Sequence, residues 1–190
     1  MNSELSALDA HLSSLGFMHK SYNELSKNRV GSSLVNDATC EAYDFDEITS
    51  KLYSHFPHSV DALLLKEDLY FIEFKRIINV AKESKQKIIK QNIQLKLSES
   101  MTTFYIEFAN KLGLDVTKFK RIAIIVVDSN KSPISAMAGV MSGLSGGDSW
   151  LSDNNFIYHS VADSSGMHVY YNCVWIWNDL NFSANICSLR

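Results

Sequence analysis

The chain has 190 residues, of which 46% are hydrophobic and 21% are charged. This composition is typical of a globular domain that buries its own core. No apolar run approaches the roughly 20 residues that span a bilayer, and the N-terminus lacks the basic start and apolar stretch of a signal peptide. We therefore expect a cytoplasmic protein with no membrane partner.

The net charge of −3 hides a strong asymmetry along the chain. Residues 1–73 contain 5 Lys/Arg and 12 Asp/Glu, whereas residues 74–96 contain 7 Lys/Arg and only Glu83 as an acid. A basic segment of this kind can contact phosphate groups even when the whole protein is acidic. Taken alone, however, the charge run is explained more simply by a solvated helix surface.

Residues 1–36 are rich in Ser and Asn and predict a short helix within an irregular N-terminal arm. We expect residues 37–190 to form a single α/β domain. Good helix-capping residues at 36–39 predict a helix that begins there, runs to about His55 and ends before Pro57. Its apolar stripe consists of Phe45, Ile48, Leu52 and Phe56.

Residues 59–65 and 69–78 have the apolar character of strands, and the polar turn 66–68 between them predicts a β-hairpin. A helix is expected from about Ser84 to Leu112, ended by Gly113. Its buried face consists of Leu97, Met101, Phe104, Phe108 and Leu112.

Residues 121–127 are apolar on both faces, as in a central parallel strand that follows a crossover helix. Residues 132–150 predict a short helix and a glycine-rich loop, and residues 155–162 and 168–177 are two further strand candidates. The order of elements predicts an α/β fold with a mixed β-sheet and flanking helices.

The predicted hairpin places three charged residues together. Glu73 and Lys75 project from the same face of the second strand. If residues 66–68 form a three-residue loop, Leu65 pairs with Leu69, and Asp61 then lies directly opposite Glu73. A loop of two or four residues would shift this register and separate the carboxylates.

Two facing carboxylates destabilise a hairpin unless a cation compensates them. Mg²⁺ or Mn²⁺ would suit these oxygen ligands, with Asp61 and Glu73 as the metal-binding residues. Lys75 would then orient or deprotonate a water molecule, or stabilise charge on a phosphate. The alternative is an amphipathic hairpin with three surface charges, which the many apolar residues on both faces make less favourable.

At these positions the chain resembles the PD-(D/E)XK nuclease superfamily, which places an Asp on one strand and Glu-x-Lys on the next. The resemblance covers roughly residues 37–128. It implies a restriction-endonuclease-like core and a metal-dependent nuclease with Asp61, Glu73 and Lys75 as catalytic residues, favouring DNA somewhat over RNA. The family often has Pro immediately before the Asp, and here Val60 occupies that position.

Three further residues are candidates for the same site. Glu41 continues the apolar stripe of the predicted first helix, from which the family often draws another metal ligand, although an acid near a helix N-terminus is also favourable by itself. Lys90 and Gln94 share a face of the long helix and could bind substrate. An ordinary exposed helix surface is the alternative for both.

Other site types lack support in the sequence. The glycines at 139–147 are not followed by Gly-Lys-Ser/Thr, so they do not form a P-loop, and no Gly-x-Ser-x-Gly indicates a serine hydrolase. Three cysteines, Cys40, Cys173 and Cys187, without CxxC or Cys/His spacing predict neither a disulfide framework nor a zinc site. We expect them to be small, reduced, buried residues.

The leading hypothesis is therefore hydrolysis of phosphodiester bonds in DNA or RNA with Mg²⁺ or Mn²⁺. One alternative is a non-catalytic binding, immunity or regulatory protein that retains this fold. The other is an unrelated α/β protein whose hairpin matches the motif by chance. A homodimer and a protein inhibitor are left open as further partners.

Overall fold

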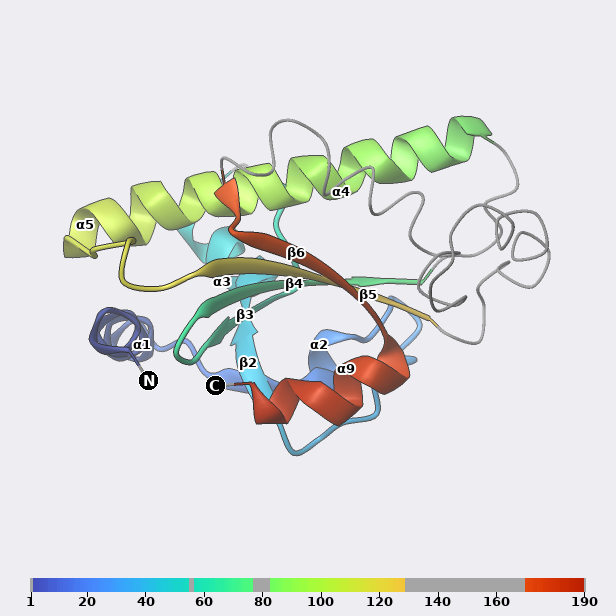
Figure 1. Cartoon of the computed structure of the whole chain (residues 1–190), viewed down its shortest axis with the longest axis horizontal. Helices are drawn as coiled ribbons and strands as arrows, with labels where there is room; N and C mark the ends of the chain where they lie inside the picture. The colour runs from blue at the N-terminus through green and yellow to red at the C-terminus, as the bar shows by residue number, and fades with distance from the viewer. Residues whose placement is uncertain (1, 55–56, 77–82, 129–169, 190) are drawn as a thin grey trace.

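The computed structural model of the chain describes residues 2–54, 57–76, 83–128 and 170–189, without the side chains of 83–87, 89 and 90. Its centre is a six-stranded sheet in which the strands lie side by side in the order of the sequence (Figure 1). The strands are β1 (His19–Ser21), β2 (Glu41–Asp44), β3 (Ala62–Leu65), β4 (Leu69–Lys75), β5 (Arg121–Val127) and β6 (Cys173–Asn178).

The direction of the strands changes in the middle of the sheet. Neighbouring strands from β1 to β4 are antiparallel, whereas β4, β5 and β6 run parallel. The crossover between β4 and β5 contains the long helix α4 (Glu83–Thr103), which continues into a π-helical turn at Phe104–Ala109 and α5 (Asn110–Leu112). Gly113 follows with a positive φ of 67°, which confirms the expected end of this helix.

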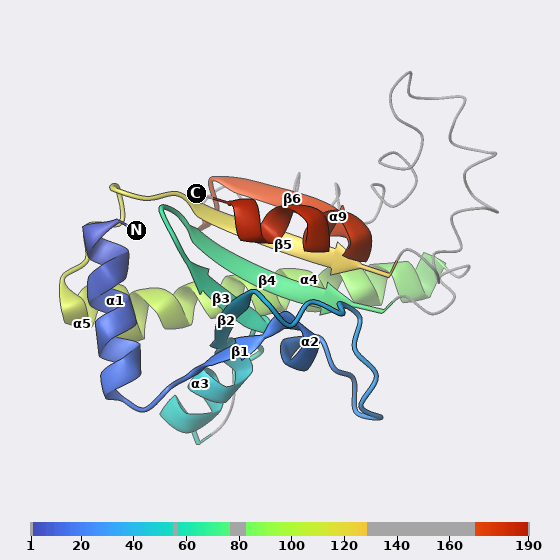
Figure 2. The ribbon, with the colours of Figure 1, turned by 90° about the horizontal axis from the view of Figure 1, so that it is seen from below.

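Helices cover both faces of the sheet. Figure 1 shows α4 along one face and α9 (Asp179–Asn185) against the other, and Figure 2 shows α1 (Ser3–Ser14) at one end of the molecule. The α/β class with a mixed sheet and flanking helices is therefore as predicted. No helix in the described ranges is long and apolar enough to cross a membrane.

Alternation along the strands divides the core into two clusters, one on each face. Leu69 and Phe71 of β4 face α4, whereas Tyr70 and Ile72 face α9. All four residues are buried, and so is β5, whose position between two parallel neighbours explains its continuous apolar run. On the α4 face, the predicted helix residues Leu97, Met101, Phe104 and Phe108 are fully or almost fully buried.

Residues 1–36 contribute to the same layers. Leu5, Leu8 and Leu12 of α1 are fully buried in the cluster on the α4 face. β1 forms one edge of the sheet by pairing with β2, and α2 (Tyr22–Leu25) follows it directly.

The predicted helix from residues 36–39 to His55 is wrong over its first half. Residues Glu41–Asp44 form β2, and α3 covers only Phe45–Leu52. Asp37 caps a local turn instead, since its Oδ1 accepts hydrogen bonds from Thr39 N and Cys40 N. The real N-cap is Asp44, whose Oδ1 accepts from Glu47 N at 2.8 Å. Sheet pairing on both edges of β2 outweighs the local capping signal.

The expectation for the cysteines is also wrong. Cys40 and Cys187 form a disulfide that links positions 147 residues apart, and Cys173 is free and exposed. Spacing along the sequence gave no sign of this pair because α9 and the short 3₁₀ turn Ile186–Ser188 return the chain to the start of β2. The late strand predicted at 168–177 corresponds in part to β6. The features predicted at 132–150 and 155–162 lie outside the described residues.

Candidate active site

The hairpin has the predicted register. Leu65 pairs with Leu69 and Ala62 with Ile72, which puts Asp61, immediately before β3, opposite Glu73. The backbone N–H of Phe74 donates to Asp61 Oδ2 at 2.6 Å and fixes that carboxylate at the strand entrance. The sequence-based placement of Asp61 beside Glu73 is thus realised in the fold.

Both carboxylates face the helix α4, because Glu73 belongs to the same strand face as Leu69 and Phe71. Lys96 of α4 extends between them. Its Nζ lies 2.9 Å from Glu73 Oε2 and 3.4 Å from Asp61 Oδ1. The repulsion that the sequence predicts between the two acids is therefore offset by an ammonium group from another element.

Lys75 completes a cluster of two acids and two bases. Its Nζ lies 2.6 Å from Glu73 Oε1, yet that oxygen has no aligned hydrogen-bond donor among the described residues. Glu73 itself is fully buried, whereas the side chains of Lys75, Lys96 and Asp61 are 20–26% exposed. Glu73 is thus the buried member of the cluster, and the other three side chains are partly accessible to solvent.

The protonation of the cluster is strongly perturbed. Burial and the neighbouring charge of Glu73 raise the pKa of Asp61 to about 8, although Lys96 and the Phe74 N–H act in the opposite direction. Burial lowers the pKa of Lys96, but the charges of Glu73 and Asp61 outweigh it and raise that pKa above its ordinary value. Perturbed titrating groups at one partly open place are typical of functional sites.

Asp46, near the start of α3, is an additional acid that the sequence did not single out. Ser59 Oγ donates to Asp46 Oδ1, and Thr49 shares a hydrogen bond of 2.9 Å with Ser59. Burial raises the pKa of Asp46, and the charges of Lys96 and Glu73 both act on it. Within the described ranges, however, Asp46 does not form a compact group of three metal-binding carboxylates with Asp61 and Glu73.

The remaining candidates are placed differently. Glu41 is exposed at the start of β2 and pairs with Ser21. It lies three residues, or about 10 Å, from the Asp44 end that adjoins Ala62, so the structure does not bring it to the carboxylate pair. Gln94 is half-buried on α4. The side chain of Lys90 lies outside the described residues.

Lys96 belongs to the cluster, whereas the sequence analysis included it only within the basic segment 74–96. A usable signal was present, since Ile93, Leu97 and Ser100 are all buried and Lys96 lies on the same side of the helix. A lysine beside such a stripe needs a buried anionic partner. Only the packing of α4 across the sheet shows that the partners are Asp61 and Glu73.

The donor set fits a hard divalent cation. Asp61 and Glu73 offer carboxylate oxygens, the ligands that Mg²⁺ and Mn²⁺ prefer, and Glu73 Oε1 is a buried oxygen without an aligned donor in the described structure. The Lys96 ammonium lies between the carboxylates, where such a cation would bind. A flexible lysine side chain can leave this position, so the two cations would compete for the same oxygens.

Comparisons with known proteins identify no relative: no family model, no curated protein and no solved structure matches the chain.

Proposed function

We propose that the protein is a metal-dependent nuclease that hydrolyses phosphodiester bonds, with Asp61, Glu73 and Lys75 as its catalytic residues. The observation that supports the proposal best is the pair of facing carboxylates, one fully buried and the other 20% exposed, with two lysines in contact. An ion cluster of this kind is a poor device for stability, because desolvation of buried charges offsets much of their attraction. Positive groups held in such a cluster can instead stabilise the negative charge that develops in a transition state.

Each residue has a distinct role in the proposed reaction. Asp61 and Glu73 would hold Mg²⁺ or Mn²⁺, which would neutralise the phosphate charge and polarise the scissile bond. Lys75, on the same strand face as Glu73, would orient the attacking water or stabilise the charge on the phosphorane-like transition state. Lys96, when the cation displaces it from the carboxylates, has its ammonium free to bind the adjacent phosphate oxygen.

The substrate class follows from the charge distribution. Lys75 and Lys96 place positive charge at the site, and contacts of this kind bind any phosphate backbone regardless of sequence. The resemblance to restriction-endonuclease-like enzymes favours DNA somewhat over RNA. We therefore propose nucleic acid as the substrate.

The test is cleavage of plasmid DNA and of a structured RNA with Mn²⁺, with and without EDTA. Glu73→Gln should abolish cleavage, because it removes a metal ligand while retaining nearly the same volume. The matched control is Glu41→Gln, which neutralises an exposed acid away from the cluster, and it should cleave like the wild type. Equal loss in both variants, or cleavage that continues in EDTA, would refute the assignment.

A non-catalytic binding or immunity protein is the second candidate, and one observation favours it. The ammonium groups of Lys75 and Lys96 already balance the carboxylate charges of Glu73 and Asp61, so the cluster needs no metal ion for charge neutrality. Such a protein would bind nucleic acid or another protein with no turnover. Nucleic-acid binding that is unchanged by Mn²⁺, combined with no cleavage, would support this alternative over the nuclease.

A further inference from the structure

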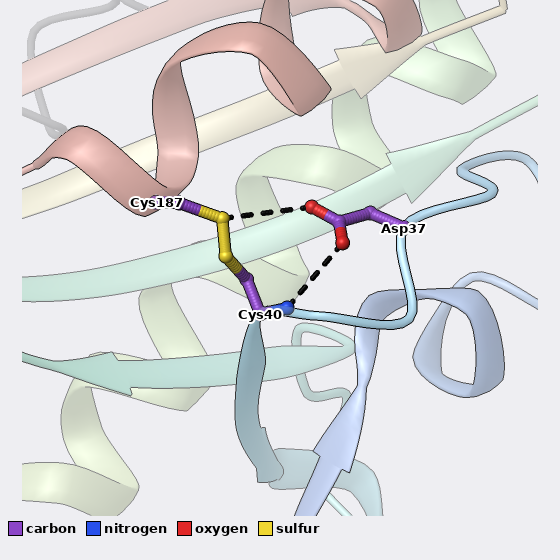
Figure 3. Close-up of side chains that lie close together, drawn as sticks. All are labelled: Asp37, Cys40 and Cys187. Atoms are coloured by element: carbon purple, nitrogen blue, oxygen red, sulfur yellow. Dashed lines mark hydrogen bonds between the residues drawn. A yellow bond between two sulfur atoms is a disulfide. The ribbon is translucent and has the colours of Figure 1, made fainter.

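A second group of ligand atoms lies away from the hairpin site, where the C-terminal turn meets the loop before β2. Asp37, Cys40 and Cys187 each offer one ligand atom, and these atoms all lie within 4.8 Å of one another (Figure 3). Two of the residues come from one loop and the third from the other end of the chain, so only the fold assembles the group.

The carboxylate of Asp37 is held in position by its own loop. Its Oδ1 accepts hydrogen bonds from Thr39 N at 2.8 Å, Thr39 Oγ1 at 2.7 Å and Cys40 N at 3.3 Å. Its Oδ2 lies 3.6 Å from Cys187 Sγ, and a dashed line marks this contact in Figure 3. A disulfide sulfur has no proton to donate to this oxygen. A thiol could donate a hydrogen bond to it, and a metal ion could bind both atoms.

The position of Cys187 does not depend on the disulfide alone. Lys66, in the β3–β4 turn, donates to the carbonyl oxygens of Cys187 at 3.0 Å and Leu189 at 2.9 Å. Phe182 and Ile186, just before, are fully buried on the α9 face of the sheet. The C-terminal turn should therefore remain beside Cys40 when the sulfur–sulfur bond is cleaved.

We propose that Asp37, Cys40 and Cys187 form a zinc site that opens when the two cysteines are reduced and is closed by their disulfide. A dithiol reductant would supply two electrons and two protons, converting the disulfide to two thiols and itself becoming a disulfide. Zn²⁺ would then bind both sulfurs as thiolates and release two protons to solvent. Water would complete a tetrahedral site with one carboxylate oxygen.

The distances suit this ion. Tetrahedral zinc with Zn–S near 2.3 Å and Zn–O near 2.1 Å places a bound oxygen about 3.6 Å from a bound sulfur, and Asp37 Oδ2 already lies 3.6 Å from Cys187 Sγ. The two sulfurs would separate to about 3.8 Å, which side-chain rotation allows at the Cα–Cα distance of 5.9 Å. Either cross-link would fasten the C-terminal turn to the sheet.

The experiment uses the full chain, reduced with dithiothreitol and freed of it by anaerobic gel filtration, then titrated with Co²⁺ as a spectroscopic probe and Zn²⁺ as a competitor. The charge-transfer band from thiolate to cobalt should saturate at one Co²⁺ per reduced protein, and Zn²⁺ should abolish it. The oxidised protein should show no such band. Metal held by Asp61 and Glu73 gives no thiolate band, so the result is independent of the proposed nuclease.

The variants separate the ligands from general effects. Cys187→Ser should lose the band, while Cys173→Ser, which removes the free exposed cysteine, should retain it. Asp37→Asn preserves both cysteines and should bind Co²⁺ at least about tenfold more weakly, which keeps the test available if Cys187→Ser does not fold. A band of equal strength in Cys187→Ser or in the oxidised protein, or none in the reduced wild type, would overturn the proposal.

Discussion

Replacing Lys96 with methionine removes the ammonium group between Asp61 and Glu73 while retaining most of the side-chain volume. Removing one partner from a buried ion cluster costs about 3–5 kcal/mol. Because Lys96 is 22% exposed and Lys75 still contacts Glu73, we expect a loss near the lower limit, about 3 kcal/mol in EDTA. For a chain of this length, that corresponds to a fall in Tm of roughly 6–12 °C.

Divalent cation should reverse this loss more strongly in the variant than in the wild type. Without the competing ammonium, Mn²⁺ should bind the two carboxylates directly, and at 100 times its Kd it would restore about 2.7 kcal/mol. Urea unfolding in EDTA and in Mn²⁺ measures both quantities. The reasoning predicts a lower Kd for Mn²⁺ in Lys96→Met than in the wild type.

The matched control is Lys111→Met, which removes a 60% exposed lysine from its i,i+4 pair with Glu107. Surface pairs contribute about 0–1 kcal/mol, so this variant should stay close to the wild type with or without Mn²⁺. If Lys96→Met is no less stable than Lys111→Met in EDTA, the lysine is not coupled to the carboxylates. If Mn²⁺ does not stabilise it, Asp61 and Glu73 do not form a metal site.

Three further predictions concern the same site and its surroundings. Lys75→Ala should abolish cleavage with little change in Mn²⁺ binding or circular dichroism; loss of the fold would make Lys75 structural. Folding raises the pKa of Asp61 to about 8 and therefore favours its protonated form. The stability that this bound proton gives to the folded protein is fully present below the unfolded pKa near 4 and is lost as pH rises toward 8. The free energy of unfolding in EDTA should therefore fall by up to about 1.4 kcal/mol per pH unit in that window, and a pH profile of Asp61→Asn that matches the wild type would contradict this. Lys87 and Lys90 both belong to the basic segment 74–96. Neutralising them together should weaken nucleic-acid binding for every sequence and flatten its salt dependence, measured with catalytically inactive Glu73→Ala. An unchanged slope would place the substrate groove elsewhere.

The local patterns determined a large part of the fold. The three-residue loop 66–68 set the hairpin register, since a loop of two or four residues would have shifted the strand pairing and separated Asp61 from Glu73. The doubly apolar run 121–127 identified β5, because only a strand covered on both faces is apolar throughout. These features are encoded over a few neighbouring residues, and so they could be predicted.

Tertiary packing decided what those patterns left open. Glu41 belongs to a strand and not to a helix because β1 and β3 pair with β2 on both sides, and no local capping preference contains that information. Likewise, Lys96 contacts Asp61 and Glu73 only because α4 crosses the sheet face. Cys187 contacts Cys40 only because α9 returns the chain to the start of β2. The sequence alone thus determined that Asp61, Glu73 and Lys75 share one face of a hairpin. The fold decided which cation lies between the acids, because contacts between distant segments depend on how whole helices pack.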